Sequence, residues 1–160
     1  MASPSQTSGP LWGFALLFEG SENAVDPSSP GAIELRGRIV DGDGLPVGWP
    51  DALVEIWHGE QLARTRTDAD GWYRAVVAKP APDDAATAPY LHLALFARGL
   101  LKQLVTRIYF PDEEAANAAD PVLELVPQER RATLVARPDG DGLRFDVVLQ
   151  GDGETAFFEF

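Results

Sequence analysis

The amino-acid sequence is dominated by short runs in which apolar and polar residues alternate, and these runs limit the choice of fold more than any other feature. Residues 33–39 alternate and then meet the turn composition Asp-Gly-Asp-Gly at residues 41–44. Residues 90–98 and 143–150 alternate in the same way, and an Asp-Gly pair at residues 70–71 marks another tight connection. Because successive side chains of a strand point to opposite faces, each alternating run predicts a half-buried β-strand.

Helix-forming segments are scarce. The best candidates are residues 112–119, which we expect to stop at Pro121, and residues 128–136, whose charged Glu-Arg-Arg run favours an exposed face. Short strands at regular spacing, separated by glycine and proline, are typical of all-β domains. The sequence therefore predicts an antiparallel β-sandwich with an extended N-terminal arm and one or two short helices.

The N-terminal region differs from the rest of the chain in composition. It shows no sustained alternation, and its prolines favour an extended arm that needs a surface to lie on. We expect this arm to cover residues 1–31 and a single β-sandwich domain to cover residues 32–160. A chain of 160 residues with 45% apolar residues can form one packed core and has no room for a second full domain. The prolines of the arm are Pro4, Pro10, Pro27 and Pro30.

Charge and cysteine content exclude several classes of function. With 13 basic and 25 acidic residues, the net charge of −12 disfavours nonspecific binding to nucleic acid or to an anionic membrane face. The absence of cysteine excludes disulfides, thiolate zinc sites and a cysteine nucleophile, and it fits a reducing compartment. The apolar run at residues 11–18 is too short to span a bilayer. We expect a cytoplasmic protein with no nucleic-acid or membrane partner.

The residues alone indicate no catalytic or metal site. The two histidines, His58 and His92, have neither a cysteine nor another histidine at ligand spacing. The glycine-rich residues 139–142 lack the lysine and the following helix of a phosphate loop, and no serine lies in a nucleophile elbow. From composition and spacing, the chain is an acidic β-domain and no more.

A resemblance to a known family takes the interpretation further, and it covers nearly the whole chain. Several stretches in this order resemble the intradiol ring-cleavage dioxygenase family, most closely the alpha subunits of its two-subunit members. The resemblance implies a β-sandwich that pairs with a homologous beta subunit carrying a ferric ion, the pair opening a carboxylated catechol with O2. The stretches are SQTSGP (residues 5–10), LRGRIVDGDGLPV (35–47), PDALVEIW (50–57), TDADGWYRA (67–75), FARGLLKQLVTRIYFPDE (96–113), DPVLELVP (120–127) and RFDVVLQGDGETAFFEF (144–160).

The resemblance also implies that this chain binds no iron. The family's site uses two tyrosinates and two histidines, hard and borderline ligands that suit ferric iron. The long loop that carries the first tyrosine is replaced here by residues 58–64, and the second tyrosine matches Asp83. The paired histidines match Tyr90 and His92, so His92 is the one ligand type retained. We expect His92 to be a relic or a structural residue and His58 to be a surface residue at a strand end.

The family's alpha subunit brings its arm to the mouth of the partner's iron pocket. The matching Thr-x-Gly-Pro segment is formed by Thr7, Gly9 and Pro10, where glycine allows close backbone approach and proline stiffens the arm. The next position, commonly aromatic in the family, is Leu11, and Trp12 is the alternative for a ring contact. The competing interpretation is that this segment only anchors the interface.

A fifth substrate-binding residue is implied at Arg98. This arginine of the FARG stretch matches a family position that reaches the substrate carboxylate, and the alternation places it on the face of Tyr90 and His92. The competing interpretation is a solvated arginine at a strand end. The predicted set of substrate-binding residues is thus Thr7, Gly9, Pro10, Leu11 and Arg98, with no catalytic residue in this chain.

Two other functions stay open at this point. PDALVEIW followed by TDADGWY also occurs in transthyretin-like β-sandwiches, so a stand-alone binding module without catalysis is one alternative; the SQTSGP arm and the RIYFPDE stretch weigh against it. A self-sufficient dioxygenase with another ligand set is the second, and it is disfavoured because 3 tyrosines and 2 histidines leave almost no spare ligands.

Overall fold

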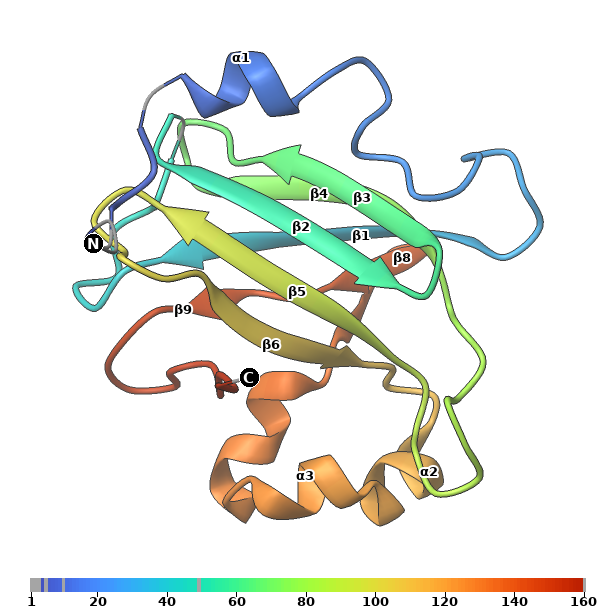
Figure 1. The fold of residues 1–160 in the computed structure, drawn as a ribbon. Helices are drawn as coiled ribbons and strands as arrows, with labels where there is room; N and C mark the ends of the chain where they lie inside the picture. Colours follow the sequence, from blue (N-terminus) through green and yellow to red (C-terminus); the bar gives the residue numbers. More distant parts are fainter. Residues whose placement is uncertain (1–3, 5, 10, 49, 160) are drawn as a thin grey trace.

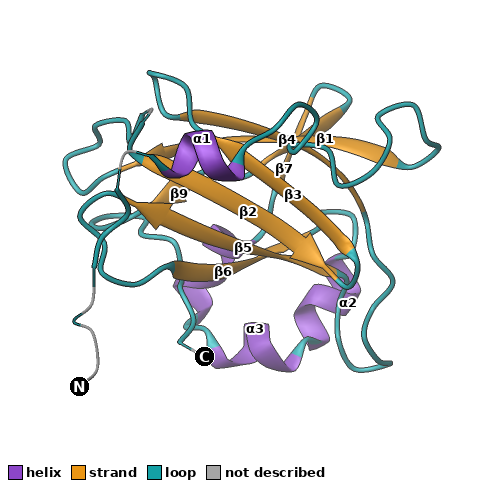
Figure 2. Cartoon of the chain, turned by 45° about the horizontal axis from the view of Figure 1, so that its top comes forward, coloured by secondary structure: helices purple, strands orange, loops and turns teal. Residues whose placement is uncertain are grey.

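The chain folds into two facing β-sheets with short helices at the margins. The structure, a computed structural model, describes residues 4, 6–9, 11–48 and 50–159. Helix α1 (Trp12–Leu16) lies beside the β3 edge of the sandwich, whereas α2 (Glu114–Ala119) and α3 (Pro121–Leu125) lie beyond β6 (Figures 1 and 2). None of the described helices has the length and apolar character needed to cross a membrane.

The two sheets have different strand orders. One has the order β4-β1-β8-β7, with β9 also paired to β1, and the other has the order β3-β2-β5-β6. All pairs are antiparallel except those of β1 with β8 and with β9, so the predicted antiparallel sandwich is confirmed with one locally parallel region. The strands are β1 (Ala32–Val40), β2 (Ala52–His58), β3 (Gln61–Arg66), β4 (Trp72–Ala78), β5 (Tyr90–Ala97), β6 (Leu104–Tyr109), β7 (Arg137–Asp139), β8 (Gly142–Arg144) and β9 (Val147–Val148).

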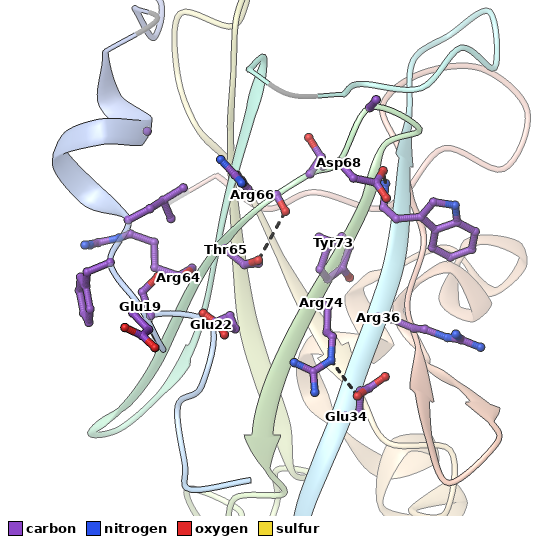
Figure 3. A pocket seen from close by; sticks show the side chains of 17 residues that line it. Glu19, Glu22, Glu34, Arg36, Arg64, Thr65, Arg66, Asp68, Tyr73 and Arg74 are labelled. Atoms are coloured by element: carbon purple, nitrogen blue, oxygen red, sulfur yellow. Dashed lines mark hydrogen bonds and ion pairs between the residues drawn. The ribbon is translucent and has the colours of Figure 1, made fainter.

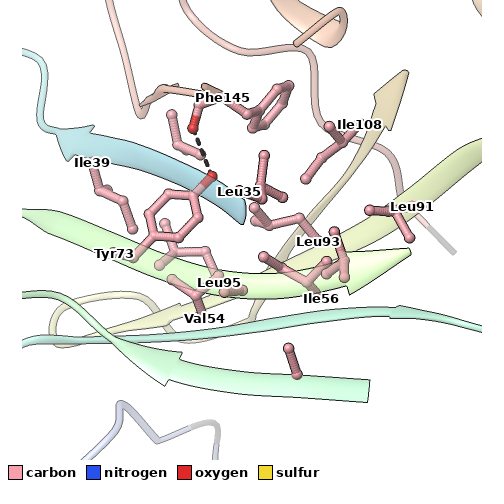
Figure 4. Close-up of a cluster of buried hydrophobic side chains, with 14 of the residues drawn as sticks. Leu35, Ile39, Val54, Ile56, Tyr73, Leu91, Leu93, Leu95, Ile108 and Phe145 are labelled. Carbon is pink, nitrogen blue, oxygen red and sulfur yellow. Dashed lines mark hydrogen bonds between the residues drawn. The ribbon is translucent and has the colours of Figure 1, made fainter. Parts of the chain in front are cut away.

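The core lies between the sheets and follows the predicted alternation. Leu91, Leu93 and Leu95 of β5 are fully buried and belong to the same cluster as Leu35 of β1 and Ile56 of β2 (Figure 4). Burying a leucine or isoleucine side chain contributes about 1.5–3 kcal/mol, so these positions stabilise the contact between the sheets. The opposite face of β5 carries Tyr90 and His92, outside this cluster.

The predicted C-terminal strand at residues 143–150 is interrupted, because the chain there passes very close to β1. An ideal Cβ at Gly37 would lie 1.7 Å from the carbonyl oxygen of Phe145, so only glycine fits at this point of β1. The Phe145 N–H donates to the carbonyl of Arg36, and the Tyr73 hydroxyl donates to the Phe145 carbonyl at 2.6 Å. These contacts bend the segment and divide it into β8 and β9.

The two predicted helical segments are helical with different bounds, whereas α1, which lies within the predicted extended arm, and α3 were not predicted. Pro121 does not only stop α2; it is the first residue of α3, where its missing N–H costs nothing. The Asp120 carboxylate caps this helix by accepting from the N–H groups of Val122 and Leu123, both at 2.9 Å. The second predicted helix is a 3-10 helix, η1 (Gln128–Leu134), shorter than the expected residues 128–136.

Part of the predicted arm closes one side of the sandwich. The Arg64 N–H of edge strand β3 donates to the carbonyl of Ser21 at 2.6 Å. The Ala24 N–H donates to the carbonyl of Val76 on β4, and the Val76 N–H donates to the carbonyl of Glu22. A four-residue stretch of the arm therefore joins the exposed edges of the two sheets, which removes unpaired backbone groups from both.

Candidate functional site

Arg98 lies at the end of β5, opposite Asp51. The register pairs Ala52 of β2 with Ala97 of β5, so the residues just beyond these strand ends face each other. The Arg98 N–H donates to the carbonyl of Asp51 at 2.8 Å. The guanidinium then meets the Asp51 carboxylate twice, with Nε 3.1 Å from Oδ1 and Nη2 3.2 Å from Oδ2. These contacts hold Arg98 in place, while its side chain stays 67% exposed and accessible to a ligand.

The arm reaches the same place through Thr7. Its Oγ1 accepts a hydrogen bond from the Gly99 N–H at 2.7 Å and lies 3.5 Å from the carbonyl oxygen of Ala97. Thr7 thus bonds to the backbone on both sides of Arg98. Gly99 has φ +97°, a left-handed conformation that glycine adopts without strain. The structure brings Thr7 and Arg98 together, as a shared substrate-binding role requires.

The structure leaves the other predicted arm residues untested. Gly9 and Leu11 are exposed, Leu11 by 73%, and Pro10 lies outside the described residues. Trp12 begins α1 and is half-buried. The roles of Gly9, Pro10 and Leu11 stay predictions.

Asp51 was missed by the sequence interpretation. It stands in the PDALVEIW stretch, which served only to indicate the family. Pairing that strand antiparallel with the FARG strand, with Ala52 opposite Ala97, would have placed Asp51 beside Arg98. The signal was therefore present, but it depended on a long-range register that a single sequence does not specify.

A second cluster gathers the residues that match the family's iron ligands. The Tyr90 hydroxyl donates to Asp83 at 2.7 Å, and His58 Nε2 lies 3.2 Å from the other oxygen of the same carboxylate. His58 ends β2 as predicted, but its side chain is only 14% exposed, so the surface assignment is wrong. The His58 ring also packs edge-on against the Tyr90 ring, with the centroids 5.1 Å apart.

Arg107 of β6 supplies the positive charge of this cluster. Its guanidinium carbon lies 3.8 Å from the centre of the Tyr90 ring, and Nη1 donates to the Tyr109 hydroxyl at 3.3 Å. The Tyr109 hydroxyl in turn donates to the buried carboxylate of Asp120 at 3.0 Å. Burial and the hydrogen bond to Asp83 raise the pKa of Tyr90, so its phenol stays protonated at neutral pH.

His92 packs as an aromatic residue in the same cluster. Its ring stacks on Trp57 at a centroid distance of 4.8 Å and meets the Tyr90 ring edge-on at 4.9 Å. Burial lowers the pKa of His92, and the neighbouring Arg107 and His58 lower it further. The imidazole is therefore neutral at pH 7, in agreement with a structural role.

The cluster does not have the chemistry of a ferric site. Ferric iron needs deprotonated oxygen ligands, whereas the Tyr90 phenol is protonated, bonded to Asp83 and covered by the Arg107 cation. In the part of the chain that the structure describes, no group of three or more histidines, aspartates and glutamates is placed to hold a metal ion. Several of these groups are bonded to one another, whereas the buried Nε of Arg107 has no hydrogen-bond partner among the described residues.

A groove lies on another part of the surface. It has a volume of about 930 Å³ and runs between the segment after α1 and strands β1, β3 and β4 (Figure 3). Its charges are arranged in pairs, such as Arg74 and Glu34 at 2.8 Å. None of the predicted site residues is among its described lining, so this groove is separate from the Arg98 site.

Comparison with known proteins shows the family. The protocatechuate 3,4-dioxygenase alpha chain of Burkholderia cepacia is 38% identical in an alignment 194 positions long, which covers 98% of this chain and 96% of the relative. The alpha chain of Pseudomonas putida is 37% identical in an alignment 195 positions long, with 99% and 96% covered. This chain belongs to the protocatechuate 3,4-dioxygenase alpha-chain family. The predicted resemblance is confirmed.

More distant similarities agree with this membership. The Burkholderia cepacia beta chain is 28% identical in an alignment 172 positions long, which covers 84% of this chain and 72% of that relative. Among solved structures, a dioxygenase domain from Streptomyces sp. SirexAA-E has a TM-score of 0.60 at 21% identity, with 84% of this chain and 88% of that chain covered. Catechol 1,2-dioxygenase from Acinetobacter sp. ADP1 has a TM-score of 0.56 at 21% identity, with 82% and 58% covered. These two structures share the fold, and no protein-family model matches the chain.

Proposed function

We propose that this chain is the alpha subunit of a heteromeric intradiol dioxygenase that opens the ring of protocatechuate, a carboxylated catechol, with O2. The observation that carries the proposal is the similarity to alpha chains over nearly the whole length of both proteins. The hydrogen-bonded cluster at the positions of the family's ligands supports the same assignment, because a chain without the family's ligand set needs a partner to supply the metal. The isolated chain is then inactive.

The partner is a homologous beta subunit that holds ferric iron. Similarity of this chain to a beta chain supports a pair of related subunits. Ferric iron held by the partner would supply the Lewis-acid chemistry that activates the catechol ring toward O2. This chain contributes by shaping the pocket, binding the substrate carboxylate and excluding water. Its lack of cysteine is compatible with the cytoplasm, where we place the complex.

Within this chain, the surface around Arg98 meets the substrate pocket. Arg98 binds the carboxylate, and the arm residues Thr7, Gly9, Pro10 and Leu11 close the mouth of the pocket. The contacts of Thr7 with Gly99 and Ala97 support this arrangement, because they hold the arm beside the exposed guanidinium. An arginine is needed here since the chain carries a net charge of −12, and its general field does not attract a carboxylate.

Coexpression with a beta chain tests the proposal. The two chains should copurify, and the complex should consume O2 and protocatechuate in equal amounts, whereas each chain alone should show little turnover. The matched control is a complex made with a beta chain whose tyrosine and histidine ligands are replaced. Failure of the chains to associate, or full activity of the beta chain without this chain, would contradict the assignment.

A further inference from the structure

We infer that Asp51 and Thr7 are positioning residues that hold Arg98 ready for the substrate carboxylate. The inference rests on the proposed function and adds two residues that the family resemblance does not assign to this task. Asp51 holds the guanidinium itself, and Thr7 fixes the backbone on either side of it. Together they make the arm, the end of β2 and the end of β5 one preassembled unit.

The geometry of the guanidinium allows Asp51 and the substrate carboxylate to bind Arg98 at the same time. Asp51 takes the side edge of the fork, Nε and Nη2, at 3.1 and 3.2 Å. An arginine has five N–H donors in a plane, so both donors of Nη1 and one of Nη2 remain, and one donor of each nitrogen points to the end edge. In the described portion of the chain, no acceptor lies on that edge. A second carboxylate can therefore bind there through two parallel hydrogen bonds.

Orientation matters because Arg98 is otherwise a solvated side chain. Its exposure of 67% leaves many rotamers open, and binding a ligand would have to restrict them. The ion pair with Asp51 restricts them before the substrate arrives. Repulsion between Asp51 and the substrate carboxylate opposes this gain, but the Arg98 cation that both carboxylates contact offsets it. The net effect of Asp51 is therefore tighter binding of carboxylated substrates.

Thr7 acts one step further away, through the main chain. Its hydroxyl oxygen receives the Gly99 N–H and lies within reach of the Ala97 carbonyl, so the turn that carries Arg98 and the arm move together. A valine at this position has nearly the same shape but makes neither contact, whereas a serine keeps the hydroxyl. The pair of variants separates the hydrogen bonds from the shape of the side chain.

Steady-state kinetics of the complex with a beta chain tests the role of Asp51. Asp51→Ala should raise KM for protocatechuate by roughly 3- to 10-fold, leave kcat within about twofold and leave KM for catechol unchanged, because catechol has no carboxylate. Asp51→Asn, which keeps the shape, should lie between the wild type and Asp51→Ala. In an Arg98→Ala background, Asp51→Ala should have no further effect, since the two residues act as one unit. Additive effects, or a lower KM in Asp51→Ala, would overturn the inference.

Thr7→Val should raise KM for protocatechuate, also by roughly threefold or more, and Thr7→Ser should restore the wild-type value. Glu34→Gln, which breaks the exposed ion pair with Arg74 on another part of the surface, is the control and should change nothing. If Arg98→Ala raises KM but neither the Asp51 nor the Thr7 variants do, the positioning role is wrong while the proposed function stands. A complex that does not cleave protocatechuate would overturn both.

Discussion

Asp120 provides a strong test of how the fold supports the cluster around Tyr90. Its side chain is fully buried and accepts four hydrogen bonds, from the N–H groups of Val122, Leu123 and Ala88 and from the Tyr109 hydroxyl. It thus joins α3, the loop before β5 and β6 at one carboxylate. We predict that Asp120→Ala is one of the most damaging single substitutions in the chain.

The magnitude follows from the groups that lose their partner. Loss of the helix cap costs about 1 kcal/mol. The N–H of Ala88 and the hydroxyl of Tyr109 lie in buried surroundings, and leaving such a donor unsatisfied costs about 1–3 kcal/mol each. Removal of a buried carboxylate returns part of this free energy, because that charge no longer has to be desolvated. We expect a net loss of about 3–5 kcal/mol, a large fraction of the roughly 5–15 kcal/mol that stabilises a typical domain.

Urea unfolding followed by tryptophan fluorescence measures this loss, with all variants at the same protein concentration because association shifts apparent stability. Asp120→Asn, which keeps one acceptor, should lose about half as much. Asp152→Ala is the control, because Asp152 is exposed and should change the free energy of unfolding by less than about 0.5 kcal/mol. An Asp120→Ala protein within about 1 kcal/mol of the wild type would refute the reasoning.

Three further outcomes are expected. In the complex, Arg98→Ala should raise KM for protocatechuate about tenfold or more and barely affect catechol, since two charge-assisted hydrogen bonds are lost; equal losses on both substrates would mean that Arg98 holds the interface. Because folding lowers the pKa of His92, the unfolded chain binds a proton at this imidazole more readily than the folded chain. The contribution of His92 to stability is therefore complete above the unfolded pKa of about 6.5 and is lost as the pH drops below it. The melting temperature should therefore fall less steeply from pH 8 to pH 5 for His92→Gln than for the wild type, and parallel curves would contradict this. Gly37→Ala should cost at least about 2 kcal/mol or abolish folding, because its Cβ would collide with the Phe145 carbonyl, and a normal melting temperature would be the contrary result.

The fold could be predicted from the sequence where local pattern decides it. In β5, Leu91, Leu93 and Leu95 are buried as their alternation indicates, because one face of the strand lines the core. The prediction of one continuous C-terminal strand was wrong because of a long-range contact. Its break depends on the close passage of Phe145 over Gly37, two residues that are distant in the sequence. Pro121 was interpreted as a stop, whereas the buried cap at Asp120 turns it into a start.

The candidate site was predicted in part. Arg98 and Thr7 came from the family resemblance, and the structure places them together. Asp51 required the register between two strands, which the sequence does not state. His58 was assigned to the surface because it ends a strand, but its side chain is only 14% exposed and pairs with Asp83, which arrives on a later loop. In each case the missing information is a contact between distant parts of the chain.

The location of the iron tests the central claim most directly. The chain should be purified alone and in complex with a beta chain, and iron should be measured by elemental analysis together with the visible spectrum. The account predicts a colourless isolated chain with far less than one iron per molecule, and a complex that shows the tyrosinate-to-iron absorption band. Stoichiometric ferric iron and visible colour in the isolated chain would contradict it.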